Sequence, residues 1–99
     1  MSDSATLTPT AVVTQGDQQV CTVVDGMAVM MDVGSGKYYR LDDIGTRVWS
    51  LIEKPITMGA LCDQLVQEFH VDRATCEADV GTLLNGMLQQ NLIRVVSNP

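Results

Sequence analysis

Few side chains of this 99-residue chain are suited to catalysis, and their spacing does not bring them together. His70 is the single histidine of the sequence. It falls at the expected end of a helix, where a cation interacts favourably with the helix dipole. A general base needs a nucleophile or an orienting partner within hydrogen-bond reach, and no motif supplies one for His70. We therefore interpret His70 as a helix-terminus residue and expect the protein not to be an enzyme.

The three cysteines give no metal signature. Cys21, Cys62 and Cys76 are an odd number, and no pair has the C-x-x-C spacing that is typical of zinc sites. An odd number of cysteines is unusual in a secreted domain, whereas in the cytosol such residues serve as small buried apolar groups. The cysteines thus favour a cytoplasmic protein, and we expect no metal and no cofactor.

Two short motifs resemble functional ones but have simpler explanations. The adjacent carboxylates Asp42 and Asp43 point in different directions, so capping of the following helix is the better interpretation. Gly34-Ser35-Gly36 precedes a strand and not a helix, so it predicts a turn and not a phosphate-binding loop.

The amino-acid composition disfavours some classes of binding partner. Six basic and twelve acidic residues give a net charge of −6, which disfavours nucleic acid and anionic membranes. No apolar run approaches the ~20 residues of a membrane span. Residues 1–10 are polar and unlike a signal peptide, so we expect a flexible N-terminal segment. Residues 11–96 are predicted to form one domain.

The residues with period-two patterns predict a three-stranded antiparallel sheet. The predicted strands are Gln18–Val24, Met27–Val33 and Lys37–Leu41. Asp25-Gly26 provides a tight hairpin turn between the first two. In the third strand, Tyr39 and Leu41 are predicted to face the core while Tyr38 and Arg40 face away. This strand is expected at an edge of the sheet, because Lys37 and Arg40 are charges of the kind that protect edges.

Two shorter apolar segments have weaker strand patterns. Residues 11–13 predict a short extra strand, and Leu92–Val96 predicts a β-prone tail that could add to the sheet.

Helical periodicity follows the sheet. Helices are predicted over Asp43–Glu53, after a cap at Thr57, and over Asp72–Gln90. The second and third helices are joined by His70-Val71-Asp72 and resemble a helix-turn-helix pair. The predicted fold is therefore α+β: a winged helix-turn-helix-like domain in which a three-stranded antiparallel sheet is followed by three helices.

DNA binding is the function that this architecture suggests first. The recognition helix of such a protein needs basic residues, because phosphate contacts supply much of the affinity. The predicted third helix begins with Arg73 but also carries Asp72, Glu77 and Asp79. A winged-helix DNA-binding regulator thus remains only as an alternative.

Peptide binding fits the pattern better. An edge strand has unpaired backbone groups to which an extended peptide can add as a further strand. The third helix has a wide apolar stripe, and beside that strand it would form a groove, although its apolar residues could instead all be core. The candidate site residues are Lys37, Tyr38, Tyr39, Arg40, Leu41, Cys76, Asp79, Val80, Leu83 and Met87.

Three segments together resemble the PqqD-like family. They are DGMAVMMD (Asp25–Asp32), GKYYRLDDIGTRVW (Gly36–Trp49) and the residues DV, LL and LQQNLI within Asp79–Ile93. The resemblance implies a recognition element that binds the leader segment of a ribosomally synthesised precursor peptide and delivers it to a modifying enzyme. It also implies that the leader adds to the strand Lys37–Leu41, against the helix Asp72–Gln90.

Within that family, the tyrosine-rich strand most resembles the discrete leader-binding proteins of lasso-peptide biosynthesis. Those proteins have a leader peptidase and a cyclase as partners. The alternative is the peptide chaperone of pyrroloquinoline quinone biosynthesis. That member usually carries a Pro- or Asn-rich stretch near the first helix, whereas this chain has Leu41-Asp-Asp-Ile-Gly45.

Overall fold

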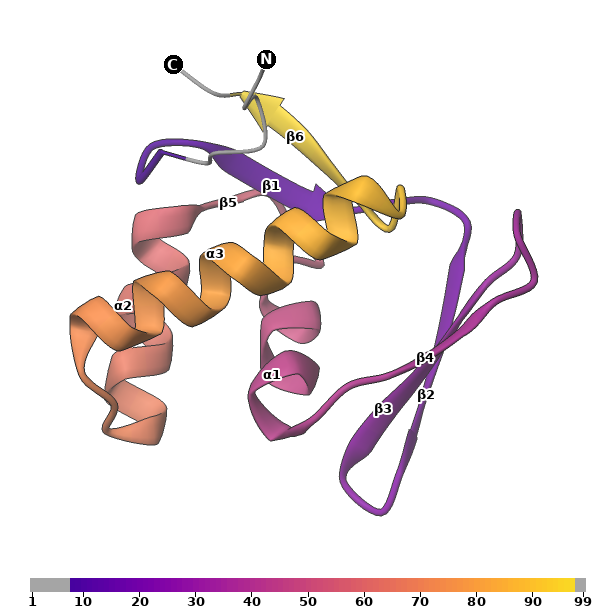
Figure 1. Ribbon diagram of the computed structural model, residues 1–99, viewed down its shortest axis with the longest axis horizontal. Helices are drawn as coiled ribbons and strands as arrows, with labels where there is room; N and C mark the ends of the chain where they lie inside the picture. Colours follow the sequence, from indigo (N-terminus) through magenta and orange to yellow (C-terminus); the bar gives the residue numbers. More distant parts are fainter. Residues whose placement is uncertain (1–7, 98–99) are drawn as a thin grey trace.

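The computed structural model describes residues 8–97, which form six strands and three helices (Figure 1). In chain order these are β1 (Val12–Gln15), β2 (Gln19–Val24), β3 (Met27–Asp32), β4 (Tyr38–Arg40), α1 (Asp43–Leu51), β5 (Ile56–Thr57), α2 (Met58–Phe69), α3 (Arg73–Gln89) and β6 (Ile93–Ser97). The strands make two separate sheets, and the three helices pack beside them (Figure 1). The predicted α+β class is confirmed.

The antiparallel sheet β2-β3-β4 is the predicted meander, and β4 lies at its edge as expected. Residues Asp25 and Gly26 both adopt positive φ, at 54° and 80°, which is the backbone that a tight hairpin requires. The register places Met30 opposite Tyr39. Met30 and Ala28, which share one face of β3, are both buried. This face of the sheet therefore packs against the helices.

A compact hydrogen-bonded junction carries β4 directly into α1. The Asp42 side chain caps the helix, because its Oδ1 accepts from the Gly45 N–H at 2.7 Å. The Thr46 hydroxyl accepts from the Ala28 N–H at 2.9 Å and donates to the Leu41 carbonyl at 3.3 Å. A side chain on residue 45 would come within 3.3 Å of Leu41, so glycine permits this close approach. The junction fixes the orientation of β4 relative to the helices.

The two later helices, α2 and α3, pack against each other across a short connection, as expected for the predicted pair. Thr57 caps α2 and Asp72 caps α3, as the sequence indicates. His70 ends α2 in the left-handed conformation, and Asn91 ends α3 in the same way. Each expected helix is present, with ends within two residues of those predicted.

The second sheet, with order β5-β1-β6, differs from the prediction. The expectation that residues 92–96 could extend the meander is wrong, because β6 pairs with β1 instead. The physical reason lies in the helix end: the left-handed Asn91 redirects the chain, and Leu92 and Ile93 are buried against the core. The short strand expected at residues 11–13 exists as β1, in the middle of this sheet.

The N-terminal segment falls partly outside the described residues. Of the ten residues predicted to be flexible, 1–7 lie outside that part of the chain. Thr8, Pro9 and Thr10 lie in a turn in which the Thr8 carbonyl accepts from the Ala11 N–H and the Pro9 carbonyl accepts from the Gly59 N–H.

One apolar core connects the helices to both sheets. Its largest fully buried side chains are Met30, Ile52, Leu61, Leu65, Leu84, Val13, Val48, Val80 and Cys62. The core therefore includes Val80 of α3, which the sequence had placed in the candidate site.

Candidate functional site

The outer edge of β4 has open backbone groups. The Asp32 N–H donates to the Lys37 carbonyl and the Leu41 N–H to the Ala28 carbonyl, each at 2.9 Å. Because successive residues of a strand direct their backbone groups to opposite edges, Tyr39 also bonds toward β3. The N–H and C=O groups of Tyr38 and Arg40 consequently point away from the sheet. These two residues are the ones to which a further strand would bond.

The side chains of β4 alternate as the sequence predicts. Leu41 is buried, and Tyr39 is half-buried against the core. Tyr38 is 70% exposed, and Arg40 is also exposed. A strand added to β4 would therefore extend a sheet whose one face, with Tyr39 and Leu41, packs on the core. The other face, with Tyr38 and Arg40, is open to solvent.

An apolar groove of about 290 Å³ lies between β4 and the C-terminal half of α3. Its lining residues are Met30, Tyr39, Arg40, Leu41, Leu83, Gly86, Met87, Gln90 and Leu92. Five of these are among the predicted site residues, so edge strand and helix stripe do meet as the sequence suggested. The Tyr39 hydroxyl donates to Gln90 Oε1 at 3.3 Å and connects the two walls.

Gly86 is a lining residue that the sequence reasoning missed. It is exposed within α3, and a Cβ placed on it would meet no atom within 4 Å. Glycine in a helix interior costs stability relative to alanine. A glycine three residues after Leu83 was the available signal, because residues at that spacing share one helix face. Its effect here is to leave the groove open.

The remaining predicted residues lie elsewhere. Cys76, Asp79 and Val80 line a smaller hollow of about 30 Å³, where α3 meets α1 and α2. Of these, Cys76 and Val80 are buried in the core, whereas Asp79 is exposed. Lys37 lines a polar hollow between the turn that precedes β4 and the end of α3. The polar hollow adjoins the groove, since Gln90 lines both, whereas the hollow at Cys76, Asp79 and Val80 shares no lining residue with the groove.

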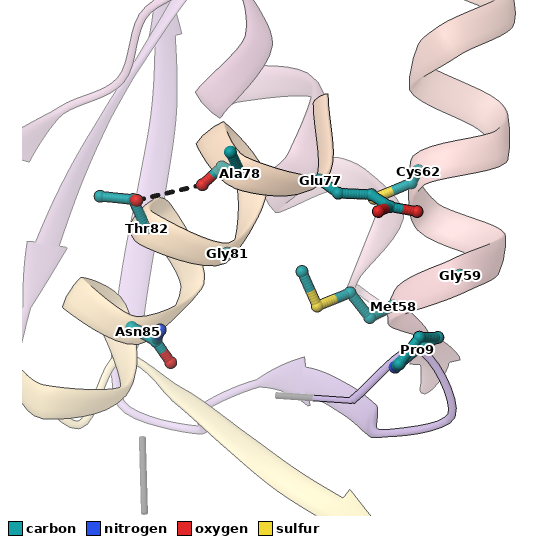
Figure 2. A pocket seen from close by; sticks show the side chains of 9 residues that line it. All are labelled: Pro9, Met58, Gly59, Cys62, Glu77, Ala78, Gly81, Thr82 and Asn85. Atoms are coloured by element: carbon teal, nitrogen blue, oxygen red, sulfur yellow. Dashed lines mark hydrogen bonds between the residues drawn. The ribbon is translucent and has the colours of Figure 1, made fainter. Parts of the chain in front are cut away.

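The opposite face of α3 has a hollow of its own, of about 350 Å³, between α3 and the start of α2 (Figure 2). Met58 and Cys62 are buried side chains at this site, and Gly81 and Ala78 come from α3. A Cβ on Gly81 would lie 3.5 Å from the Met58 methyl group, which is ordinary van der Waals contact. This hollow does not involve β4.

The titratable groups show structural roles. Hydrogen bonds from Ser35 and Gln19 lower the pKa of Asp32. The bonds between Asp32 and Ser35 stabilise the turn before β4. Burial raises the pKa of the Cys62 thiol to about 11, with a smaller effect from Cys76 nearby, so this thiol stays protonated at neutral pH. Among residues 8–97, no group of three or more His, Cys, Asp or Glu side chains could hold a metal ion.

Comparison with known proteins identifies the family. Residues 28–93 match the family model described as Coenzyme PQQ synthesis protein D (PqqD). The chain belongs to the PqqD family. The matched segment runs from β3 to the start of β6, so it contains both walls of the groove. No curated protein matches this PqqD-family chain.

Solved structures share the fold of this PqqD-family protein. TbiB1 in complex with the TbiA(beta) leader peptide has a TM-score of 0.77 at 28% identity, covering 86% of this chain and 99% of that one. A lasso peptide synthetase B1 complexed with the leader peptide has a TM-score of 0.73 at 18% identity, covering 83% and 96%.

A third similar structure is the PqqD truncation of Methylobacterium extorquens PqqCD, described as a functional and stand-alone recognition element for ribosomally synthesised and modified peptides. Its TM-score is 0.76 at 20% identity, covering 91% of this chain and 96% of that one. As for membrane association, none of the helices within the described part of the PqqD-family chain has the length and apolarity to cross a bilayer.

Proposed function

We propose that this PqqD-family protein is a non-catalytic adaptor that binds the leader segment of a ribosomally synthesised precursor peptide by strand addition to β4. The observation that carries the proposal is the open edge of Tyr38 and Arg40 beside the apolar groove between β4 and α3. Backbone bonds at that edge are independent of peptide sequence, whereas the groove selects side chains. The adaptor then delivers the bound peptide to a modifying enzyme or leader peptidase in the cytoplasm.

The walls of the groove suit an extended peptide. Tyr39, Leu41 and Met87 are held by the core, so a peptide meets a surface that is already formed. A preformed site lowers the entropy cost of binding. Leu83 is half-buried and borders the groove from α3, so it is more available to the peptide than Met87 on the same wall, which is buried.

The lasso-peptide pathway is the setting that we favour. TbiB1, the neighbour with 28% identity, is described in complex with a leader peptide. We extend that binding to this chain because its sequence contains the tyrosine-rich strand. A peptide chaperone of pyrroloquinoline quinone biosynthesis is the second candidate, and the family model that matches residues 28–93 favours it.

The charge pattern of α3 argues against the alternative of a DNA-binding regulator. Arg73 is the basic residue of α3, and it forms ion pairs with Asp63 and Glu77. An arginine already paired with two carboxylates contributes little to phosphate binding.

A titration with the leader of the precursor encoded beside this gene tests the proposal. We expect the amide signals of Tyr38 and Arg40 to shift on binding and their hydrogen exchange to slow. The variants Tyr38→Ala and Tyr38→Pro separate the contribution of the side chain to binding from that of the backbone. Both remove the tyrosine side chain, but only proline also removes the outward N–H. Tyr38→Ala should bind within about threefold of the wild type, and Tyr38→Pro at least about tenfold more weakly, in line with one lost hydrogen bond.

Circular dichroism and thermal unfolding serve as the control that both variants are folded. If folded Tyr38→Pro binds the leader as well as Tyr38→Ala does, strand addition at β4 is wrong.

A further inference from the structure

Strand β2, at the opposite edge of the meander from β4, is unusually exposed for an apolar strand. Its residues from Val20 to Val24 are all exposed, on both faces. Val20, Val23 and Val24 are 57%, 64% and 53% exposed. In an antiparallel sheet with one face on a core, exposed positions are usually polar. Figure 1 shows that the tip of the β2–β3 hairpin projects beyond the helices, in agreement with this exposure.

The backbone of β2 also has an unpaired edge. The Val33 N–H donates to the Gln18 carbonyl at 2.8 Å, so the even-numbered residues of β2 bond toward β3. The N–H and C=O groups of Gln19, Cys21 and Val23 therefore point outward. Within the described part of the chain, no strand pairs with this edge, since the sheet order is β2-β3-β4.

β2 lacks the features by which edge strands usually avoid pairing. Charged residues and proline normally prevent association at a sheet edge. Residues 18–24 contain neither, and Asp17 and Asp25 are the charges at the two ends. By contrast, β4 is half as long and has Arg40 in the strand and Lys37 directly before it.

We propose that β2 is a self-association surface and that its occupant is a second copy of this chain, which pairs antiparallel through its own β2. An antiparallel pair of identical strands satisfies two-fold symmetry, because whenever residue i of one copy meets residue j of the other, residue j of the first also meets residue i of the second. An axis through Thr22 pairs Cys21 of one copy with Val23 of the other, and both have outward backbone groups. The same axis sets Val20 opposite Val24, so apolar side chains meet on both faces.

The charge of the molecule supports this register. Each copy carries a net charge of −6, so two copies associate only where the contact is free of carboxylates. In the proposed register, Asp25 lies opposite Gln19 and not opposite another carboxylate. The result is a continuous six-stranded sheet whose two outermost strands are the β4 edges. Both peptide grooves remain accessible in such a dimer.

Sedimentation velocity over a range of concentrations tests this proposal with the full chain. We expect the wild type to form a concentration-dependent dimer. Val23→Glu should raise the dimer dissociation constant at least about tenfold, because it sets a charge at an apolar cross-strand contact on each copy. Val96→Glu is the matched control: Val96 is 55% exposed on β6, and the substitution changes the net charge equally. This control should dimerise as the wild type does.

A second pair of variants tests the backbone. Cys21→Ala keeps the outward N–H and should still dimerise, whereas Cys21→Pro removes it and should not. A wild type that remains monomeric at the highest concentrations overturns the proposal, and so does equal dimerisation by folded Cys21→Pro and Cys21→Ala. Leader binding by monomeric Val23→Glu should match the wild type, so this test is independent of the proposed function at β4.

Discussion

Gly86 and Gly81 both lie within α3, but they face different surroundings. Gly86 borders the groove, and a methyl group there would meet no protein atom within 4 Å. Gly81 borders the hollow of Figure 2 on the other face, where a methyl group would contact Met58. Since both sites accept a side chain without a clash, the absence of one at Gly86 has no explanation in packing. We propose that glycine at this position leaves open space for a ligand.

Gly86→Ala should therefore increase stability and decrease leader affinity. Alanine in place of a helical glycine stabilises by up to about 1 kcal/mol. The added methyl group would occupy space next to Leu83, where a peptide side chain is expected, and we predict a loss of affinity of about tenfold or more, the size of a small steric conflict in a packed site. Urea unfolding and calorimetric titration measure the two effects.

Gly81→Ala is the control for Gly86→Ala. It should give a similar gain in stability with leader affinity unchanged, because Gly81 lies away from β4. If both variants bind the leader equally well, the groove beside Gly86 is not where the peptide side chains lie.

At the same scale, the sequence predicted side-chain directions better than backbone directions. Alternation along β4 was sufficient to assign Tyr39 and Leu41 to the core side, as the burial confirms. Which residues have free N–H groups depends on the register with β3, and the hydrogen bonds of the structure give this to Tyr38 and Arg40. The prediction from the apolar stripe of α3 was incomplete in a similar way. Helical periodicity alone does not say which residues of the stripe border β4 and which, such as Val80, border the other helices.

At the scale of elements, helix and hairpin boundaries followed from local chemistry, whereas the second sheet did not. Asp42, Thr57 and Asp72 are short-range capping signals, and each caps the expected helix. The pairing of β1 with β6 joins segments about eighty residues apart, such as Thr14 with Arg94. Neither strand has a turn that leads to the other, so no local pattern could specify this contact.

The ion pair between α1 and α2 makes their packing sensitive to acid. Arg47 donates two hydrogen bonds to the Glu68 carboxylate, at 2.7 and 2.8 Å. These bonds, with a further one from Gln64, lower the pKa of Glu68 from 4.5 to about 2. A carboxylate whose pKa is lower in the folded state stabilises the fold above its unfolded pKa. That stabilisation is lost as the pH falls from 4.5 through about 2.

We predict that Glu68→Gln is less stable than the wild type at pH 7 and that the difference disappears toward pH 2. The effect is modest because the pair is partly exposed. Urea unfolding at a series of pH values measures it. Glu53→Gln provides a control, because Glu53 is exposed and takes part in none of the ion pairs of residues 8–97. A stability difference for Glu68→Gln that is constant from pH 7 to pH 2 would contradict this role.

At the scale of the whole molecule, the acidic net charge disfavours DNA as a ligand, and the preformed groove favours a peptide. A winged helix that bound DNA would need to overcome the net charge of −6 with a basic surface. The groove instead offers apolar side chains and backbone groups, with Arg40 as its one charged lining residue among those described. This chain thus combines a winged-helix-like architecture with a surface that suits a peptide.

This difference predicts how binding responds to salt. Apolar contacts and backbone hydrogen bonds are weakly screened, so leader affinity should change by less than about threefold between 50 and 200 mM salt. Binding to duplex DNA through several phosphates would weaken by about 10³–10⁵ over the same range. Fluorescence anisotropy with labelled leader and labelled duplex, at matched protein concentrations, measures both. Because the groove is formed by residues that the core already holds, salt should leave its shape unchanged, and a steep loss of leader affinity would mean that charges outside the groove supply the binding energy.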